Sequence, residues 1–124
     1  MLLKLLASVV ALRNCGDGTG TITGMGFSPE SPKAGDQTEL WVAYALHSPI
    51  TGGTATYSYT FNGIPFSPTV DDLCTQTECP KAVGDYNETS QSEFPSFSGK
   101  AVTKIQWVDQ NKAPEWCAEL TFKI

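Results

Sequence analysis

The sequence contains a single histidine, His47, among 124 residues, which excludes most metal centres built on imidazole ligands. No apolar run approaches the roughly 20 residues that a helix needs to span a bilayer. Basic residues are scarce as well, since eight Lys and Arg stand against thirteen Asp and Glu, a formal net charge of -5. Nucleic acids and anionic membranes attract clustered basic side chains, so this charge balance argues against both as electrostatic partners. A composition of 40% hydrophobic and 17% charged residues is typical of one small globular domain.

The sequence motifs of common catalytic sites are also absent. The chain has no Gly-x-Ser-x-Gly elbow, no Walker loop and no His-Glu-x-x-His motif. His47 precedes Ser48-Pro49, so we interpret it as a turn residue and not as a catalytic base. Asp71 and Asp72 are adjacent, and neighbouring side chains of an extended chain point to opposite sides, so we interpret them as solvated loop residues. We therefore expect a binding protein without cofactor or metal, and not an enzyme.

The first twelve residues, MLLKLLASVVAL, place one lysine before an apolar run. Because Val9 and Ala11 are small residues near its end, we interpret residues 1–12 as a short secretory signal. An ordinary first strand or a short buried helix is the alternative. A sequon at Asn87 (Asn-Glu-Thr) predicts N-glycosylation of a secreted chain.

Four cysteines are present, Cys15, Cys74, Cys79 and Cys117, without the CxxC spacing of a structural zinc site. Four cysteines allow three pairings. Cys74 and Cys79 are five residues apart, a spacing suited to a closed surface loop, which leaves Cys15 and Cys117 near the two ends of the folded region. Free buried thiols in a cytosolic protein are the alternative.

Short β-rich runs alternate with Gly, Pro and Asn turns along the chain, which is typical of a sandwich or barrel. The clearest runs alternate apolar and polar residues, the pattern of half-buried strands in antiparallel sheets. We predict strands over residues 19–27, 38–46, 54–61, 100–108 and 116–124, and a weaker one over 81–89. No segment after residue 13 shows sustained helical periodicity, and Asn62-Gly63 marks a turn. The predicted fold is an all-β sandwich of two antiparallel sheets.

An ordinary immunoglobulin domain joins its sheets by a central disulfide, with a tryptophan packed on it. Here Trp41 lies 26 residues after Cys15, and no Tyr-x-Cys motif precedes Cys74 or Cys79. Bridges between the chain ends and within one loop leave the middle of the sheets unlinked. Two sheets held only at an edge can separate and leave an apolar gap between them.

Several short motifs follow one another in a defined order. They are Asn14-Cys15-Gly16, Phe27-Ser28-Pro29, Gly63-Ile64-Pro65-Phe66, the loop CTQTECP from Cys74 to Pro80, Phe94-Pro95-Ser96 and the final Cys117. Together they resemble the ML lipid-recognition domain, the family of the secreted Niemann-Pick type C sterol carrier, the group 2 mite allergens and fungal phosphatidylglycerol/phosphatidylinositol transfer proteins. The resemblance covers residues 14–124.

This resemblance implies an immunoglobulin-like sandwich with a lipid cavity between its sheets, and the disulfides Cys15–Cys117 and Cys74–Cys79. It further implies a carrier of one sterol, fatty acid or phospholipid, secreted or in the lumen of an endosome, lysosome or vacuole. We expect a monomer with transient contacts to a membrane or a membrane receptor. The candidate lipid-binding residues at the rim motifs are Ile64, Pro65, Phe66, Phe94 and Pro95. Candidates on the inner faces, which any filled core would also need, are Leu40, Val42, Tyr44, Tyr57, Tyr59, Ile105, Trp107, Leu120 and Phe122.

Two other functions fit the same pattern. A lipid-presenting accessory protein would bind lipid and then dock on a receptor, and a ring of apolar residues around the pocket mouth would favour it. A structural or adhesive β-sandwich would have a filled core and no ligand. The volume of the core separates these readings, because a filled sandwich holds no ligand-sized cavity.

Overall fold

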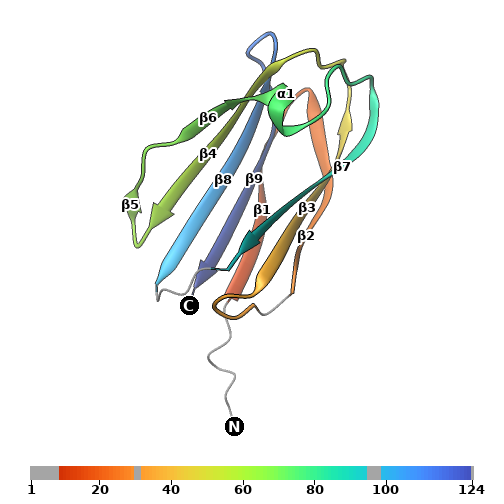
Figure 1. The fold of residues 1–124 in the computed structure, drawn as a ribbon. Coiled ribbons are helices and arrows are strands. Elements are labelled where there is room, and N and C mark those ends of the chain that lie inside the picture. The colour runs from red at the N-terminus through yellow and green to blue at the C-terminus, as the bar shows by residue number, and fades with distance from the viewer. Residues whose placement is uncertain (1–8, 30–31, 95–98, 124) are drawn as a thin grey trace.

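The computed structural model describes residues 9–29, 32–94 and 99–123, and most of them lie in two antiparallel β-sheets (Figure 1). The large sheet contains β1 (Val9–Asp17), β9 (Pro114–Lys123), β8 (Lys100–Asp109) and β4 (Gly53–Phe61), in that order. Two short strands, β5 (Ile64–Pro65) and β6 (Thr69–Asp72), both pair with the outer edge of β4. The small sheet has the order β2 (Gly20–Ser28), β3 (Gln37–Leu46) and β7 (Gly84–Glu93). This arrangement confirms the predicted all-β sandwich.

Five strands, β2, β3, β4, β8 and β9, match the predicted ones to within two residues at either end. The turn at Asn62-Gly63 has φ values of 50° and 82°, as a hairpin turn with two left-handed residues requires. Strand β7 extends to Glu93, beyond the weak strand predicted over 81–89, because it pairs with β3 along its whole length.

Strand β1 was not among the predicted strands. Its residues from Val9 to Leu12 belong to the apolar segment interpreted as a signal, yet they pair in register with β9, for example Leu12 with Leu120. For these four residues the structure agrees with the alternative, an ordinary first strand. Residues 1–8 lie outside the described part of the chain, and the signal over residues 1–12 stays a prediction.

The predicted loop at Asp71 and Asp72 is wrong in one respect, because both residues lie in β6, paired with β4. The strand ends where the Asp72 side chain accepts a hydrogen bond of 2.9 Å from the backbone N–H of Cys74. This contact caps the single-turn helix α1 (Leu73–Gln76), which is too short to produce a periodic sequence signal.

The two sheets come together along the side formed by β1 and β2. Gly18 lies in the turn between these strands, and a side chain there would collide with the backbone carbonyl of Pro114. The backbone N–H of Thr19 donates to the same carbonyl at 3.0 Å. On the other side, β7 forms an edge of the small sheet, and β5 and β6 form an edge of the large one (Figure 1).

Aromatic rings from both sheets form two clusters in the core. Tyr44 of β3 lies 5.9 Å from Trp107 and 5.6 Å from Trp116 between ring centroids. Near the other end of the strands, Phe94 lies 5.0 Å from Phe122 and 6.5 Å from Phe27. These contacts hold the sheets against each other through noncovalent packing.

Neither disulfide links one sheet to the other. Cys15–Cys117 joins the neighbouring strands β1 and β9 of the large sheet, and Cys74–Cys79 closes the loop that contains α1. Both pairings are those predicted. The middle of the sandwich therefore carries no covalent cross-link.

The two disulfides close loops of very different length, with sequence separations of 102 and 5 residues. We expect Cys15→Ala with Cys117→Ala to lower the free energy of unfolding by roughly 4–5 kcal/mol, and Cys74→Ala with Cys79→Ala by roughly 2 kcal/mol, because the longer loop restricts the unfolded chain more. Urea denaturation of both double variants measures this difference. Equal losses would show that chain entropy is not the main contribution of these bridges.

Candidate functional site

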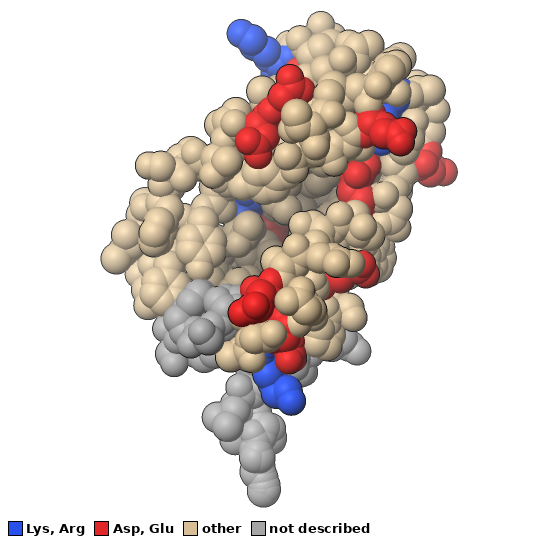
Figure 2. Space-filling view, viewed as in Figure 1, with Lys and Arg blue, Asp and Glu red and all other residues tan. Residues whose placement is uncertain are grey.

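A cavity lies between the two sheets beside the edge strand β7, and the space-filling view shows the hollow on this face (Figure 2). It has two adjoining sections that share the lining residues Leu40, Tyr57, Ser90 and Ile105. We call the larger one, of about 310 Å³, the phenylalanine section, and the smaller one, of about 110 Å³, the indole section. Ligand pockets commonly measure about 300–1,000 Å³, so the cavity is large enough for a small ligand.

The phenylalanine section is lined mainly by apolar side chains from both sheets. Its apolar and aromatic residues are Phe27, Leu40, Tyr57, Tyr59, Phe94, Ile105, Leu120 and Phe122, and its polar ones are Thr38, Ser90, Ser92, Glu93 and Thr103. Phe94 is only 2% exposed and belongs to the core as well as to the cavity wall. Burial raises the pKa of Tyr59 above its ordinary value, which keeps this hydroxyl neutral. The section offers a hydrocarbon chain a largely uncharged surface.

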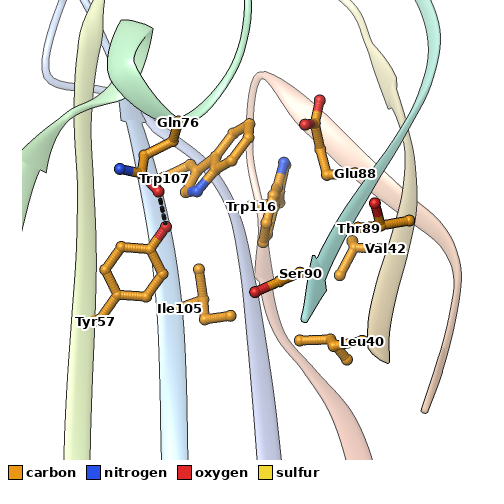
Figure 3. Close-up of a pocket in the computed structure, with 10 residues that line it drawn as sticks. All are labelled: Leu40, Val42, Tyr57, Gln76, Glu88, Thr89, Ser90, Ile105, Trp107 and Trp116. Atoms are coloured by element: carbon orange, nitrogen blue, oxygen red, sulfur yellow. Dashed lines mark hydrogen bonds between the residues drawn. The ribbon is translucent and has the colours of Figure 1, made fainter. Parts of the chain in front are cut away.

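The indole section lies beneath α1 and contains two tryptophan rings (Figure 3). Trp107 and Trp116 are opposite each other in the β8–β9 register, and their ring centroids are 4.6 Å apart. Tyr57 donates a hydrogen bond of 2.9 Å to the side-chain carbonyl of Gln76, which α1 holds over the section. Capping by Asp72 and the Cys74–Cys79 bridge fix α1, and so fix the position of Gln76.

A network of polar side chains borders the indole section on the side of β7. Glu88 Oε2 accepts hydrogen bonds from the Tyr44 hydroxyl at 2.8 Å and the Thr77 hydroxyl at 3.0 Å. Lys81 Nζ lies 3.5 Å from the same oxygen and 4.3 Å from the centre of the Tyr86 ring. Burial and the bond to Glu88 raise the pKa of Tyr44 far above its ordinary value, so Tyr44 remains a donor. Glu88 is therefore held in place by three partners.

Glu115 is a fully buried acidic residue at the same end of the sandwich. Neither of its carboxyl oxygens has a hydrogen-bond partner within the described residues. Burial raises its pKa from 4.5 to about 7, with further increases from Asp109 and Glu88, while Lys81 acts in the opposite direction. The carboxyl group is thus neutral in mildly acidic solution and becomes charged near neutral pH.

Most of the predicted inner-face residues line the cavity. These are Leu40, Val42, Tyr57, Tyr59, Ile105, Trp107, Leu120 and Phe122, together with the rim candidate Phe94. Tyr44 is fully buried behind the two tryptophans and is not part of the lining. Whether these residues bind lipid stays a prediction.

The other rim candidates lie elsewhere. Ile64 and Phe66 are 65% and 55% exposed, on or beside the short strand β5 with Pro65, and none of the three lines either section. Phe66 contacts the cavity only indirectly, since its ring packs 5.5 Å from that of Tyr59. Pro95 lies outside the described residues.

Sequence reasoning missed several residues of the lining. Phe27, Gln76, Glu88, Ser90 and Trp116 were not among the candidates. Trp116 could have been found, because it alternates with Leu120 and Phe122 on the inner face of β9. Gln76 carries no such signal, because only the fold of the α1 loop brings it to the cavity.

Other features singled out in the sequence lie away from the cavity. His47 is exposed after β3, with Nε2 2.8 Å from the Thr21 hydroxyl, and Asn87 is exposed on β7. Within the described ranges, no three His, Cys, Asp or Glu side chains gather in a way that could hold a metal ion. No helix in this part of the chain has the length and apolarity to cross a membrane.

A two-sheet sandwich with an internal, mainly apolar cavity defines the general class of ligand-binding β-sandwich proteins. The sequence assigns the chain more closely, since the ML domain model matches residues 9–124. The chain belongs to the ML domain family. The matched region begins at Val9, so it includes β1 and is longer than the domain predicted over 14–124.

Two proteins of Dictyostelium discoideum resemble the chain in sequence. "Putative phosphatidylglycerol/phosphatidylinositol transfer protein 1" and the protein of the same description numbered 3 are each 30% identical to it over 103 residues, which cover 79% of this chain and 68% of theirs.

Solved structures show the same fold. A Niemann-Pick type C2 protein from the Japanese carpenter ant has a TM-score of 0.68 at 11% identity, covering 90% of this chain and 96% of its own. Chicken MD-1, crystallised with lipid IVa, has a TM-score of 0.63 at 15% identity, covering 94% of this chain and 90% of its own. The immunoglobulin-like fold implied by the sequence is confirmed.

The raised pKa of Glu115 predicts that the free energy of unfolding depends on pH. Between pH 4.5 and about 7 the folded protein binds more protons than the unfolded chain, so its free energy of unfolding falls as the pH rises through this window. The pKa difference corresponds to a loss of up to roughly 3 kcal/mol. We expect Glu115→Gln to remove most of this dependence, so that the variant is more stable than the wild type at pH 8 and similar to it at pH 5.

Thermal denaturation at several pH values measures the effect. Glu119→Gln on the same strand is the matched control, since Glu119 forms an ion pair of 2.9 Å with the exposed Arg13, a type of contact that contributes little. It should keep the pH dependence of the wild type. Parallel curves for the wild type and Glu115→Gln would show that Glu115 is not the titrating group.

Proposed function

We propose that this protein is a non-catalytic lipid carrier, which holds one amphipathic lipid between its two sheets. The observation that carries the proposal is the cavity itself, open beside β7 and lined by aromatic and aliphatic side chains of both sheets. Membership of the ML domain family supports it, as do the names of the relatives, which describe phosphatidylglycerol and phosphatidylinositol transfer.

The energy of burying hydrocarbon is sufficient for binding without a charged contact. Each methylene removed from water contributes about 0.8 kcal/mol, so a chain of about a dozen methylenes gains roughly 10 kcal/mol before the costs of ordering and desolvation. The phenylalanine section provides mainly apolar surface for such a chain. Binding in the micromolar range or tighter follows from this balance.

Because no disulfide links the two sheets, they can separate and admit a lipid. Both disulfides lie within the large sheet or the α1 loop, so the small sheet can move away from the large one along the β7 side without breaking a covalent bond. A lipid then enters from this side.

We further propose that the protein works outside the cytosol, either secreted or in the lumen of an endosome, lysosome or vacuole. Disulfides persist mainly in such oxidising compartments, and the described cysteines are all paired. The exposed position of Asn87 on an edge strand is compatible with a glycan there.

The exposed apolar residues at the edge of the large sheet point to a surface for transfer. Ile64 and Phe66 are 65% and 55% exposed, and the Phe66 ring packs 5.5 Å from that of Tyr59, which lines the cavity. We propose that they contact the membrane during uptake or delivery of lipid. The same residues would serve a lipid-presenting protein that docks on a receptor, which is the second candidate function.

Blocking the cavity tests whether it binds lipid. Ser90 lines both sections from the exposed edge strand β7, so Ser90→Trp should fill the space without removing any core contact. We expect it to reduce lipid binding at least tenfold, measured by native mass spectrometry after incubation with a lipid mixture. Gln91→Trp is the matched control, because Gln91 is exposed on the outer face of β7, opposite Glu39.

Lipid captured equally by both variants would show that binding occurs elsewhere. A wild type that acquires no mass of a few hundred daltons from the mixture would favour the structural sandwich instead. Melting temperatures of the two variants should agree, since both residues are exposed.

The transfer surface makes a separate prediction. We expect Ile64→Ser to slow lipid transfer between vesicles several-fold while leaving the equilibrium affinity for lipid unchanged, because Ile64 lies outside the cavity lining. Val83→Ser is the control, since Val83 is 58% exposed and lies just before β7 of the small sheet, whereas β5 belongs to the large sheet. Equal transfer rates for both variants would remove Ile64 from the membrane contact. A normal rate in Ile64→Ser together with loss of receptor binding would favour the accessory role.

A further inference from the structure

We propose that the indole section is a hydrogen-bonding subsite that receives an uncharged oxygen of the lipid, with Trp107 and Trp116 as the donors. The proposal rests on the proposed function of the cavity and specifies the chemistry of its ligand. The ligand class is a neutral lipid with a hydroxyl or carbonyl group at its buried end.

The two indole N–H groups are buried donors without a well-formed hydrogen bond. Trp107 and Trp116 are 4% and 3% exposed, and neither Nε1 meets hydrogen-bond geometry with an acceptor in the described part of the protein. The Trp107 N–H approaches the Tyr57 hydroxyl and opposes the rise that burial causes in the pKa of Tyr57. Both residues line the indole section, where their rings lie side by side between Tyr57 and Glu88 (Figure 3). A buried donor left unpaired costs about 1–3 kcal/mol, so two such donors at a cavity wall favour a ligand that brings an acceptor.

Two nearby protein oxygens already accept hydrogen bonds from other side chains. The Gln76 carbonyl accepts from the Tyr57 hydroxyl, and Glu88 Oε2 accepts from the hydroxyls of Tyr44 and Thr77. The Gln76 amide nitrogen in turn donates to the Thr75 hydroxyl at 3.3 Å. The section therefore offers donors to a ligand, and it is complementary to an oxygen that accepts hydrogen bonds.

The surrounding charge selects a neutral acceptor. Glu88 lines the section, and Glu115 interacts electrostatically with Glu88 and Asp109 and, with opposite sign, with Lys81. Lys81 is itself placed between the Glu88 carboxylate and the Tyr86 ring. A phosphate or carboxylate would meet acidic residues here, and Figure 2 shows acidic side chains on the β7 side of the hollow as well.

The size of the indole section also favours a small, uncharged group over a charged headgroup. Its volume of about 110 Å³ accommodates a hydroxyl, ketone or ester group with a few carbons, and it is too small for a phosphoinositol headgroup. The adjoining phenylalanine section of about 310 Å³ accommodates the hydrocarbon part. A lipid bound in this way lies with its small oxygen group beneath α1 and its hydrocarbon among the phenylalanines.

Three ligands of equal chain length test the proposal, namely 1-dodecanol, dodecane and dodecanoate. Their affinities are compared by displacement of a fluorescent probe, 1-anilinonaphthalene-8-sulfonate, and the indole N–H signals of ¹⁵N-labelled protein are followed by NMR. We expect dodecanol to bind roughly three- to tenfold more tightly than dodecane, the ratio that one or two hydrogen bonds provide. Dodecanol should also shift the N–H signals of Trp107 and Trp116 downfield.

Tryptophan-to-phenylalanine variants identify the donors, because they keep an aromatic ring and remove the N–H. In the double variant with Trp107→Phe and Trp116→Phe, the preference for dodecanol over dodecane should fall to about one. Trp41→Phe is the matched control, since Trp41 lies on the other face of β3, over Gly26, and lines neither section. Its preference for dodecanol should equal that of the wild type.

The outcomes separate this proposal from the proposed function. If none of the three ligands binds, the carrier function itself fails. Equal binding of dodecanol and dodecane without indole shifts would leave the carrier function intact and overturn the subsite, with the N–H groups then bonded to water. Tightest binding by dodecanoate at pH 8, with indole shifts, would overturn the choice of a neutral oxygen. The NMR result on the wild type decides the matter even if the double variant does not fold.

Discussion

Tyr44 connects the two sheets at one end of the sandwich, because its ring on β3 packs against Trp107 and Trp116 of the large sheet. At the other end, Phe94 packs against Phe122 and Phe27. In the strand register Trp107 and the Ala101 that faces Phe122 are six residues apart, which corresponds to about 20 Å along β8. The cavity occupies the space between these two contacts, so the positions of the aromatic residues along the strands determine its length.

The same aromatic cluster explains why the polar groups collect at the α1 end. Tyr44 places its hydroxyl against Glu88, and Glu88 in turn contacts Thr77 after α1 and Lys81 before β7. This network connects the small sheet to the loop that also holds Gln76 above the tryptophans. A cavity that is mainly apolar along its length therefore ends in a region rich in donors and acceptors.

Much of the fold could be predicted because its central strands face the core on one side and solvent on the other. β3 alternates in this way along its whole length, and most of the inward-facing residues predicted on β3, β4, β8 and β9 line the cavity. The cysteine spacing likewise predicted both disulfides. The strands and the Cys74–Cys79 loop depend on short-range patterns that the sequence contains directly. Cys15 and Cys117, 102 residues apart, were the pair left once Cys74 and Cys79 were joined, and the family resemblance implies the same pairing.

The features that were missed depend on contacts between distant segments. β1 resembles a leader because its residues are apolar, and only its pairing with β9 identifies it as a strand. β7 is a polar edge strand (GDYNETSQSE), so its inward-facing Glu88 and Ser90 do not stand out in the sequence. Ile64 and Phe66 were assigned to the pocket from a motif, whereas the structure has them exposed, Ile64 in the edge strand β5 and Phe66 just after it. Tertiary contacts, and not local preference, decide all of these positions.

The cavity leaves some core side chains without packing contacts, and under the proposed function a bound lipid would provide them. A ligand that binds the folded state alone stabilises it by about 2.7 kcal/mol when present at a hundred times its Kd. Because noncovalent packing holds the two sheets together, a lipid bound as proposed would act as additional core. Under the proposed function the empty protein would then be the less stable form, and direct replacement of one lipid by another would avoid it.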